Sequence, residues 1–294
     1  LRTEHKESEV TAKLIDRYRS MMGRSIGRLS YTPLSENEKE QYVHMTRLST
    51  ENLTEKWRTG RKILRTEIAY RGITDYPESK LETSLLLDAV INLLDDVYDE
   101  AMGKDEMSLY IVELISAISK MGTLISDEDR NTMEAYFQKI LVIAFSELLL
   151  RDRIAESSSH EERLSHVTRC YEIKSMDMDA FIELPLRAKG FNEESVSRWV
   201  ELGRVHRAIS IIVKDLDDLE HDRRVGEQTP VVLLCRGSDA PCMVLDDCVK
   251  HFEEEAEKVW SLMPEEQRII GENLCAMIGS AVELYEENCW RLRE

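Results

Sequence analysis

The chain has 294 residues, of which 42% are hydrophobic, and its 57 acidic against 39 basic residues give a net charge of −18. A protein that binds nucleic acid presents a basic face, and this sequence offers none. No apolar run reaches the ~18 residues of a membrane span. The six cysteines include no CxxC pair, so we expect reduced thiols in a cytoplasmic protein. Only 12 Gly and 6 Pro punctuate the chain, which favours long helices.

The first part of the chain predicts helices after a peripheral segment over residues 1–30. The Ser-Glu spacing of "SENE" at 35–38 is that of a capping box and predicts a helix to about Gly60. "RKILRTEIAY" continues as a second segment, and residues 76–103 form one long helix, with a further helix to about Gly122. The apolar stripe of the long helix consists of Leu81, Leu85, Val90, Leu93, Leu94 and Val97.

The second part continues in the same way. "SDED" at 126–129 caps a helix that carries "YFQKILVIAFSELLL", and after "SSSHEE" a helix extends to Gly190. "NEES" at 192–195 caps the next helix, which we expect to continue through Asp222 before a loop, "RRVGEQTP". "GSDAP" and "MPEE" start the last two helices. The prediction is an all-α fold: a single domain over residues 1–294, a bundle of about ten helices around an apolar cavity.

Carboxylates follow an apolar run in "INLLDDVYDE". Asp95 and Asp99 are four residues apart and share a helix face, and Asp96 and Glu100 form a second such pair. Like charges at this spacing repel, and partial burial raises the cost. Either the cluster is a solvated helix end or a cation compensates it.

A second cluster favours the cation. In "KDLDDLEHDRRVGEQ", Asp215, Asp218 and Asp222 form one stripe on a helix, again behind an apolar run, "AISIIV". If the two helices face each other, their carboxylates converge at the mouth of an apolar cavity. Hard oxygen ligands of this kind suit Mg²⁺, which prefers a substrate phosphate as co-ligand.

At these residues the chain resembles the class I isoprenoid synthases, the superfamily of trans-prenyltransferases and terpene cyclases. "DDVYD" matches their DDxxD motif. "YEIKS" at 171–175 is similar to their Lys-Thr motif, with Ser175 for Thr, and the 41 residues from Lys174 to Asp215 are a typical separation. "GRKILR" at 60–65 looks like a degenerate form of their basic segment.

The resemblance implies an enzyme with three Mg²⁺ ions. Asp95, Asp96 and Asp99 would bind metal from one helix, and Asp215, Asp218 and Asp222 from the other. Lys174 would bind the substrate diphosphate, and Arg169 lies near the position of a diphosphate-sensing arginine. The further basic candidates for the diphosphate are Arg61, Lys62, Arg65, Arg223 and Arg224. With Asp95, Asp99 and Lys174, Arg169 completes the predicted catalytic set.

For several residues a simpler interpretation remains open. Arg169 fits a surface salt bridge equally well, and Arg223 and Arg224 fit an exposed loop. Phe181 and Trp199, like Tyr98, would line a hydrocarbon pocket or be ordinary core aromatics.

The signals of the two subfamilies are mixed. Elongating prenyltransferases carry an Arg pair after DDxxD, and here only Lys104 follows. The second cluster fits the spacing of the cyclase motif, with Lys214, Asp218 and Asp222 in the ligand positions and Gly226-Glu227 after them. We therefore prefer a terpene cyclase that ionises an allylic prenyl diphosphate. A trans-prenyltransferase that also uses isopentenyl diphosphate is the alternative.

A non-catalytic, degenerate subunit also stays open, because Lys214 cannot bind a metal as an ammonium ion. The substrate chain length, the product and the formation of a homodimer are not decided by the sequence.

Overall fold

The structure is a computed structural model that describes residues 125–237 and 240–292 and scattered positions before them. The earlier positions are 62, 63, 66, 80, 83–85, 87, 88, 90–92, 115, 118 and 122. All regular elements in these ranges are helices, which confirms the all-α prediction for the described part of the chain. Within the same ranges, no helix is both long and apolar enough to cross a membrane. The predicted helix at 35–60 lies outside the described residues.

The chain divides into two compact units. The first consists of Leu1–Glu67 and Tyr76–Asp129, and the second of Ile68–Asp75 and Arg130–Glu294. In the first unit, the described positions between 80 and 92 are helical, inside the long helix predicted for 76–103. Leu85 and Val90 of its predicted apolar stripe are fully buried.

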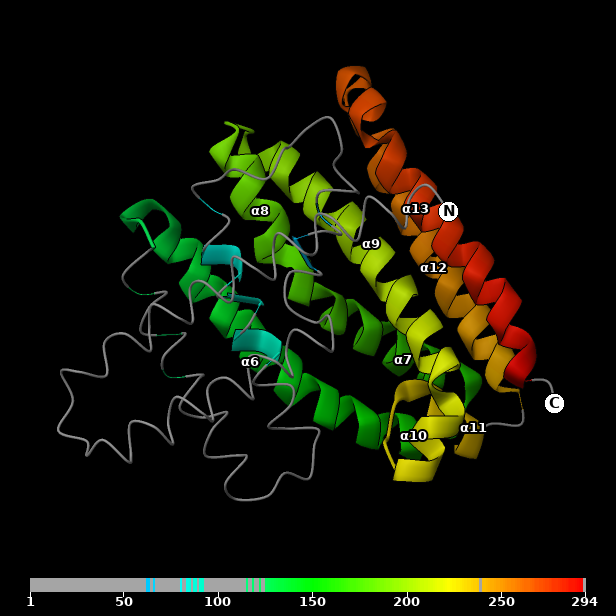
Figure 1. Cartoon of the computed structure of the whole chain (residues 1–294). Coiled ribbons are helices and arrows are strands. Elements are labelled where there is room, and N and C mark those ends of the chain that lie inside the picture. The colour runs from blue at the N-terminus through cyan, green and yellow to red at the C-terminus, as the bar shows by residue number, and fades with distance from the viewer. Residues whose placement is uncertain are drawn as a thin grey trace, which may run out of the picture. The chain divides into compact units, whose positions relative to one another are not determined.

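Most of α6 and all later helices belong to the second unit (Figure 1). They are α6 (Asp127–Glu156), α7 (His160–Ser175), η2 (Met176–Met178), α8 (Asp179–Ala188), α9 (Glu193–Asp217), α10 (Leu219–Val225), α11 (Pro230–Gly237), α12 (Pro241–Ser261), α13 (Glu265–Cys289) and η3 (Trp290–Leu292). The central helix is α9, which packs against α7, α8, α12 and α13. Its second half buries an apolar run that consists of Val205, Ala208, Ile209, Ile211, Ile212, Val213 and Leu216.

The helix starts follow the predicted caps. Ser126 Oγ accepts a hydrogen bond from the backbone N–H of Asp129 at 3.3 Å, and Asn192 Oδ1 accepts one from the N–H of Ser195 at 2.8 Å. Ser159 and Glu162 form a reciprocal capping box at the start of α7. These bonds satisfy N–H groups that have no partner inside their helix, which explains why short polar runs start these helices.

The stretch predicted as one helix from "SSSHEE" to Gly190 is broken, so that prediction is wrong in detail. Helix α7 ends at Ser175, a single turn of 3-10 helix follows, and α8 begins at Asp179. Partly buried ion pairs with Arg207 and Arg204 hold Asp177 and Asp179 at this break. The chain then turns at Gly190, whose φ of +82° suits a residue without Cβ.

Helix α11 was not predicted. It follows a Thr-Pro pair, in which Thr229 Oγ1 accepts the N–H of Val232 at 3.3 Å and Pro230 opens the helix. A capping hydroxyl followed by proline at the first helical position is a start signal in itself. The sequence therefore held evidence for this helix beside the predicted loop.

Of the three aromatics considered for a hydrocarbon pocket, Phe181 and Trp199 lie in the core, and Tyr98 lies outside the described residues. Phe181 and Trp199 are both 0% exposed. The ring of Phe181 meets Tyr136 edge to face, with centroids 6.2 Å apart. Trp199 packs against the backbone of α13 at Gly271, where an added Cβ would lie 2.6 Å from the indole ring. This close approach explains why a glycine stands inside a long helix at that point.

Candidate functional site

Helices α7 and α9 bring two predicted motifs together. Tyr171, three residues before Lys174 on α7, donates a hydrogen bond from Oη to Asp215 Oδ2 on α9 at 2.9 Å. Tyr171 is fully buried and Asp215 is 5% exposed. The Lys174 ammonium interacts electrostatically with the Asp215 carboxylate. Residues 41 positions apart in sequence thus share one buried polar site.

Charge decides the state of this site. Burial raises the pKa of Asp215, although the Lys174 ammonium and the Tyr171 hydroxyl act against that rise. For Lys174, burial alone would lower the pKa, but the carboxylates of Asp215 and Glu147 outweigh it and raise the pKa above its ordinary value. Lys174 is therefore a fixed positive charge beside the second acidic cluster.

The second cluster does not lie on one continuous helix, which corrects the prediction. Helix α9 ends at Asp217, and Asp218 joins it to α10, with its N–H bonded to the carbonyl of Lys214 at 2.9 Å. Helix α10 then takes up the start of the predicted loop, so Arg223 and Arg224 lie in its last turn.

Gly226 ends α10 and turns the chain back. Its φ is +82°, and the N–H of Glu227 bonds to the carbonyl of Asp222 at 2.9 Å, as in a Schellman motif. This bond is the structural reason for the Gly-Glu pair after the cluster. It also holds Glu227 near enough to act on the Asp222 carboxylate.

Negative charge accumulates at this end of α9. Asp222 is 4% exposed, and burial first, then the carboxylates of Glu227, Asp215 and Asp218, raise its pKa to about 6. Lys214 lowers it only weakly, because its side chain is 74% exposed and reaches only Asp218, at 3.9 Å. The region therefore has an excess of carboxylate over nearby cation.

The described residues do not complete a metal site. Among them, no group of three His, Cys, Asp or Glu side chains lies close enough to hold a metal ion. Asp215 accepts a hydrogen bond from Tyr171, and Asp222 lies close enough to Glu227, Asp215 and Asp218 for their charges to raise its pKa. The predicted ligands Asp95, Asp96 and Asp99 lie outside the described residues.

In the first unit, buried polar groups precede that first cluster in the sequence. Asp88 and Asn92 are one turn apart and 1% and 7% exposed. Sequence reasoning missed both, because it took this stretch for a purely apolar lead. The available signal was the spacing of four residues from Asp88 to Asn92 and from Asn92 to Asp96.

The predicted diphosphate-binding cations have different surroundings. Lys174 points inward, whereas Arg169 is 63% exposed and pairs with Glu172 on its own helix at 3.0 Å. Arg223 pairs with Glu220 at 3.0 Å and hydrogen-bonds the thiol of Cys235. Arg224 is exposed. Of these four cations, Lys174 has the largely buried setting expected of a substrate-binding cation.

The basic segment at 60–65 is described only in part. Lys62 is helical and half-buried, and its carbonyl accepts a hydrogen bond from the hydroxyl of Thr66 at 2.8 Å. Arg61 and Arg65 lie outside the described residues.

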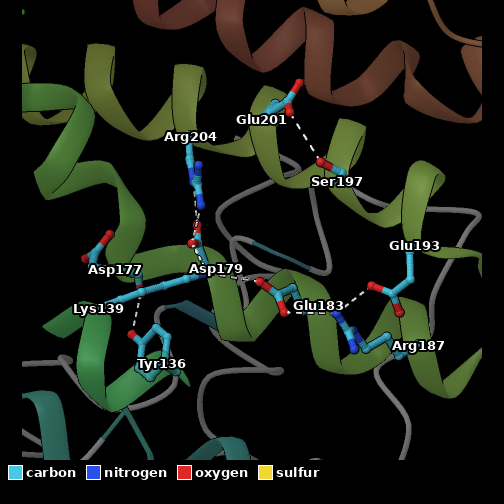
Figure 2. Close-up of polar contacts among 10 residues, drawn as sticks. All are labelled: Tyr136, Lys139, Asp177, Asp179, Glu183, Arg187, Glu193, Ser197, Glu201 and Arg204. Carbon is cyan, nitrogen blue, oxygen red and sulfur yellow. Dashed lines mark hydrogen bonds and ion pairs between the residues drawn. The ribbon is translucent and has the colours of Figure 1, made fainter. Parts of the chain in front are cut away.

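Sequence reasoning missed a second charged group, which begins at Asp177, three residues after Lys174. Figure 2 shows the contacts around Asp179 in this group. At the break between α7 and α8, Asp179 accepts two hydrogen bonds from the guanidinium of Arg204, at 2.8 and 2.5 Å, and one from Lys139 at 2.7 Å. Asp177 is held in the same two-pronged way by Arg207, at 3.0 and 2.8 Å. The signal for this group in the sequence was the two aspartates of "MDMD" together with the two arginines of "GRVHR".

Comparison with known proteins found no matching family model, no matching curated protein and no matching solved structure. The resemblance to isoprenoid synthases therefore stays a prediction from the motifs.

Proposed function

We propose that the chain is a Mg²⁺-dependent class I isoprenoid synthase that ionises an allylic prenyl diphosphate, and that it acts as a terpene cyclase. The observation that carries the proposal is the meeting of Lys174 with Asp215, which Tyr171 hydrogen-bonds, beside the under-compensated carboxylate of Asp222. A buried cation next to an excess of carboxylate suits an anion and its metal ions bound together.

The resemblance assigns Mg²⁺ to Asp215, Asp218 and Asp222 of the second cluster and to Asp95, Asp96 and Asp99 of the first, which lies outside the described residues. The bound ions, three by the resemblance, would neutralise the charge that grows on the leaving diphosphate. Lys174 would donate hydrogen bonds to the same diphosphate. Tyr171 keeps Asp215 oriented beside Lys174. The buried apolar residues of α9, among them Ile209, Ile212 and Val213, would exclude water from the carbocation.

The cyclase is preferred to the prenyltransferase on one structural ground. Asp222, a ligand in the cyclase spacing, is buried with a pKa raised to about 6. Asp215, which the cyclase spacing does not use, is already hydrogen-bonded to Tyr171. Asp222 is thus the carboxylate that most needs a cation.

Two measurements test the proposal. Inorganic diphosphate with Mg²⁺ should raise the melting temperature of the protein, because a ligand that binds only the folded state stabilises it. No response to the pair would support the non-catalytic subunit.

Geranyl, farnesyl and geranylgeranyl diphosphates should then release diphosphate and yield a hydrocarbon or an alcohol. Longer prenyl diphosphates that appear only after isopentenyl diphosphate is added would establish the prenyltransferase instead.

A further inference from the structure

Glu147 of α6 lies between two cations. Its Oε1 accepts a hydrogen bond from Lys174 Nζ on α7 at 2.8 Å and another from Arg151 Nη2, one turn further on α6, at 2.6 Å. The three side chains are only 18–22% exposed. Glu147 is therefore the direct counter-ion of the lysine to which the proposed function assigns the diphosphate.

This carboxylate stays charged. Burial alone would raise the pKa of Glu147, but the charges of Lys174 and Arg151 outweigh it and hold the pKa below its ordinary value. A buried ammonium without a counter-ion would be strongly destabilising. Glu147 thus compensates Lys174 whenever no anion is bound.

The contact between Glu147 and Lys174 should weaken the binding of an anion at Lys174. An ammonium ion has three N–H donors, and Glu147 takes one of them. A diphosphate that reaches Lys174 must share the ammonium with a carboxylate in direct contact with it, and two anions close together in a partly buried site repel.

We propose that Glu147 competes with diphosphate for Lys174 and thereby limits the affinity of the site for this anion. The inference rests on the proposed function, since it takes Lys174 as a diphosphate-binding residue. The competition would help the inorganic diphosphate product to leave, a step that often limits turnover.

A purely structural ion pair predicts a different change in the affinity for diphosphate when Glu147 loses its charge. If Glu147 only fastened α6 to α7, its loss would weaken the site or leave anion binding unchanged. A competitor predicts a gain of affinity, and damage to the fold does not produce such a gain.

The test is the variant Glu147→Gln, which keeps the shape and one hydrogen-bond acceptor but removes the charge. Titration calorimetry with inorganic diphosphate, without and with Mg²⁺, should show tighter binding by about 5- to 10-fold in the Mg²⁺-free experiment, as expected when one like charge is removed at close range. With Mg²⁺ the gain should be smaller, because the metal ions already offset the repulsion.

The matched control is Glu183→Gln on α8. The Glu183 carboxylate also bridges two cations, Lys139 at 3.2 Å and Arg187 at 3.5 Å. The affinity of the Glu183→Gln variant for diphosphate should equal that of the wild type. If Glu147→Gln fails to fold, Glu147→Asp replaces it, because the shorter side chain loosens the contact and should give a smaller gain.

A double variant shows whether the effect passes through Lys174. Adding Lys174→Gln to Glu147→Gln should abolish the gain, and a gain that persists would overturn the inference in favour of Arg151. Binding by the wild type without a gain in Glu147→Gln would overturn the inference alone. A wild type that binds no diphosphate with or without Mg²⁺ would refute the proposed function as well.

Discussion

Two groups of largely buried aspartates, Asp177 with Asp179 and Asp215 with Asp222, lie along α9, and they differ in how their charge is balanced. Beside the middle of the helix, Asp177 and Asp179 each receive both prongs of an arginine, and Asp179 also receives Lys139. At the C-terminal end, Asp222 has no hydrogen bond or ion pair from a side chain among the described residues, and neighbouring carboxylates surround it.

This difference distinguishes aspartates that stabilise the fold from aspartates that are expected to bind a cation. A carboxylate paired in two prongs by arginine is satisfied, and its removal leaves a buried cation without a partner. A carboxylate that burial and its neighbours push toward protonation is destabilising as it stands. Such an arrangement is expected where a bound cation completes the site.

The largest effect on stability is expected for Asp177 and Asp179, whose charges arginines balance. Asp179→Asn should lower the free energy of unfolding by about 3–5 kcal/mol, because Arg204 and Lys139 lose the buried charge that compensates them. Denaturant unfolding measures it. Glu193→Gln, at a 75% exposed side chain that pairs with Arg187, is the control and should change stability by less than about 1 kcal/mol. Equal effects of the two variants would mean that the Asp179 pairs are not structural.

Removing the charge of Asp222 should change stability in the opposite direction. Asp222→Asn should raise the free energy of unfolding by roughly 1 kcal/mol at pH 7 without metal, because it removes a buried charge that its neighbours repel. The same variant should bind Mg²⁺-diphosphate more weakly. Destabilisation together with unchanged diphosphate binding would make Asp222 a structural residue like Asp179.

The pH dependence should follow from the same carboxyl group. Its pKa rises from 3.8 to about 6 on folding, so the folded state binds more protons than the unfolded state between these values. The stability that protonated Asp222 contributes is therefore present at low pH and is lost as pH rises from about 4 to 6. Unfolding curves of wild type and Asp222→Asn should diverge over this range, and parallel curves would contradict the raised pKa.

The smallest effect on stability is expected at Asp218. Its side chain is 47% exposed and lies 3.9 Å from Lys214, so Asp218→Asn should change the free energy of unfolding by less than about 0.5 kcal/mol. The affinity for Mg²⁺-diphosphate should nevertheless fall. A titration in which only Asp222→Asn, and not Asp218→Asn, weakens binding would restrict the site to the buried carboxylate.

Local sequence determined much of the second unit. Capping residues predicted the starts of α6 and α9, the polar run "SSSHEE" that of α7, and a proline near the first turn those of α12 and α13, because these signals act within one turn. The carboxylate stripe and Lys174 could be singled out for the same reason, since spacing along one helix sets which residues share a face.

Tertiary structure decided how these charges are balanced. Nothing near Asp179 in sequence shows that Arg204, 25 residues later, satisfies it, or that Glu147 reaches Lys174 from α6, 27 residues away. The break after Ser175 likewise coincides with ion pairs to α9. Pairing of buried charges depends on which helices pack together, and that packing comes from the apolar core around α9, which local spacing does not encode.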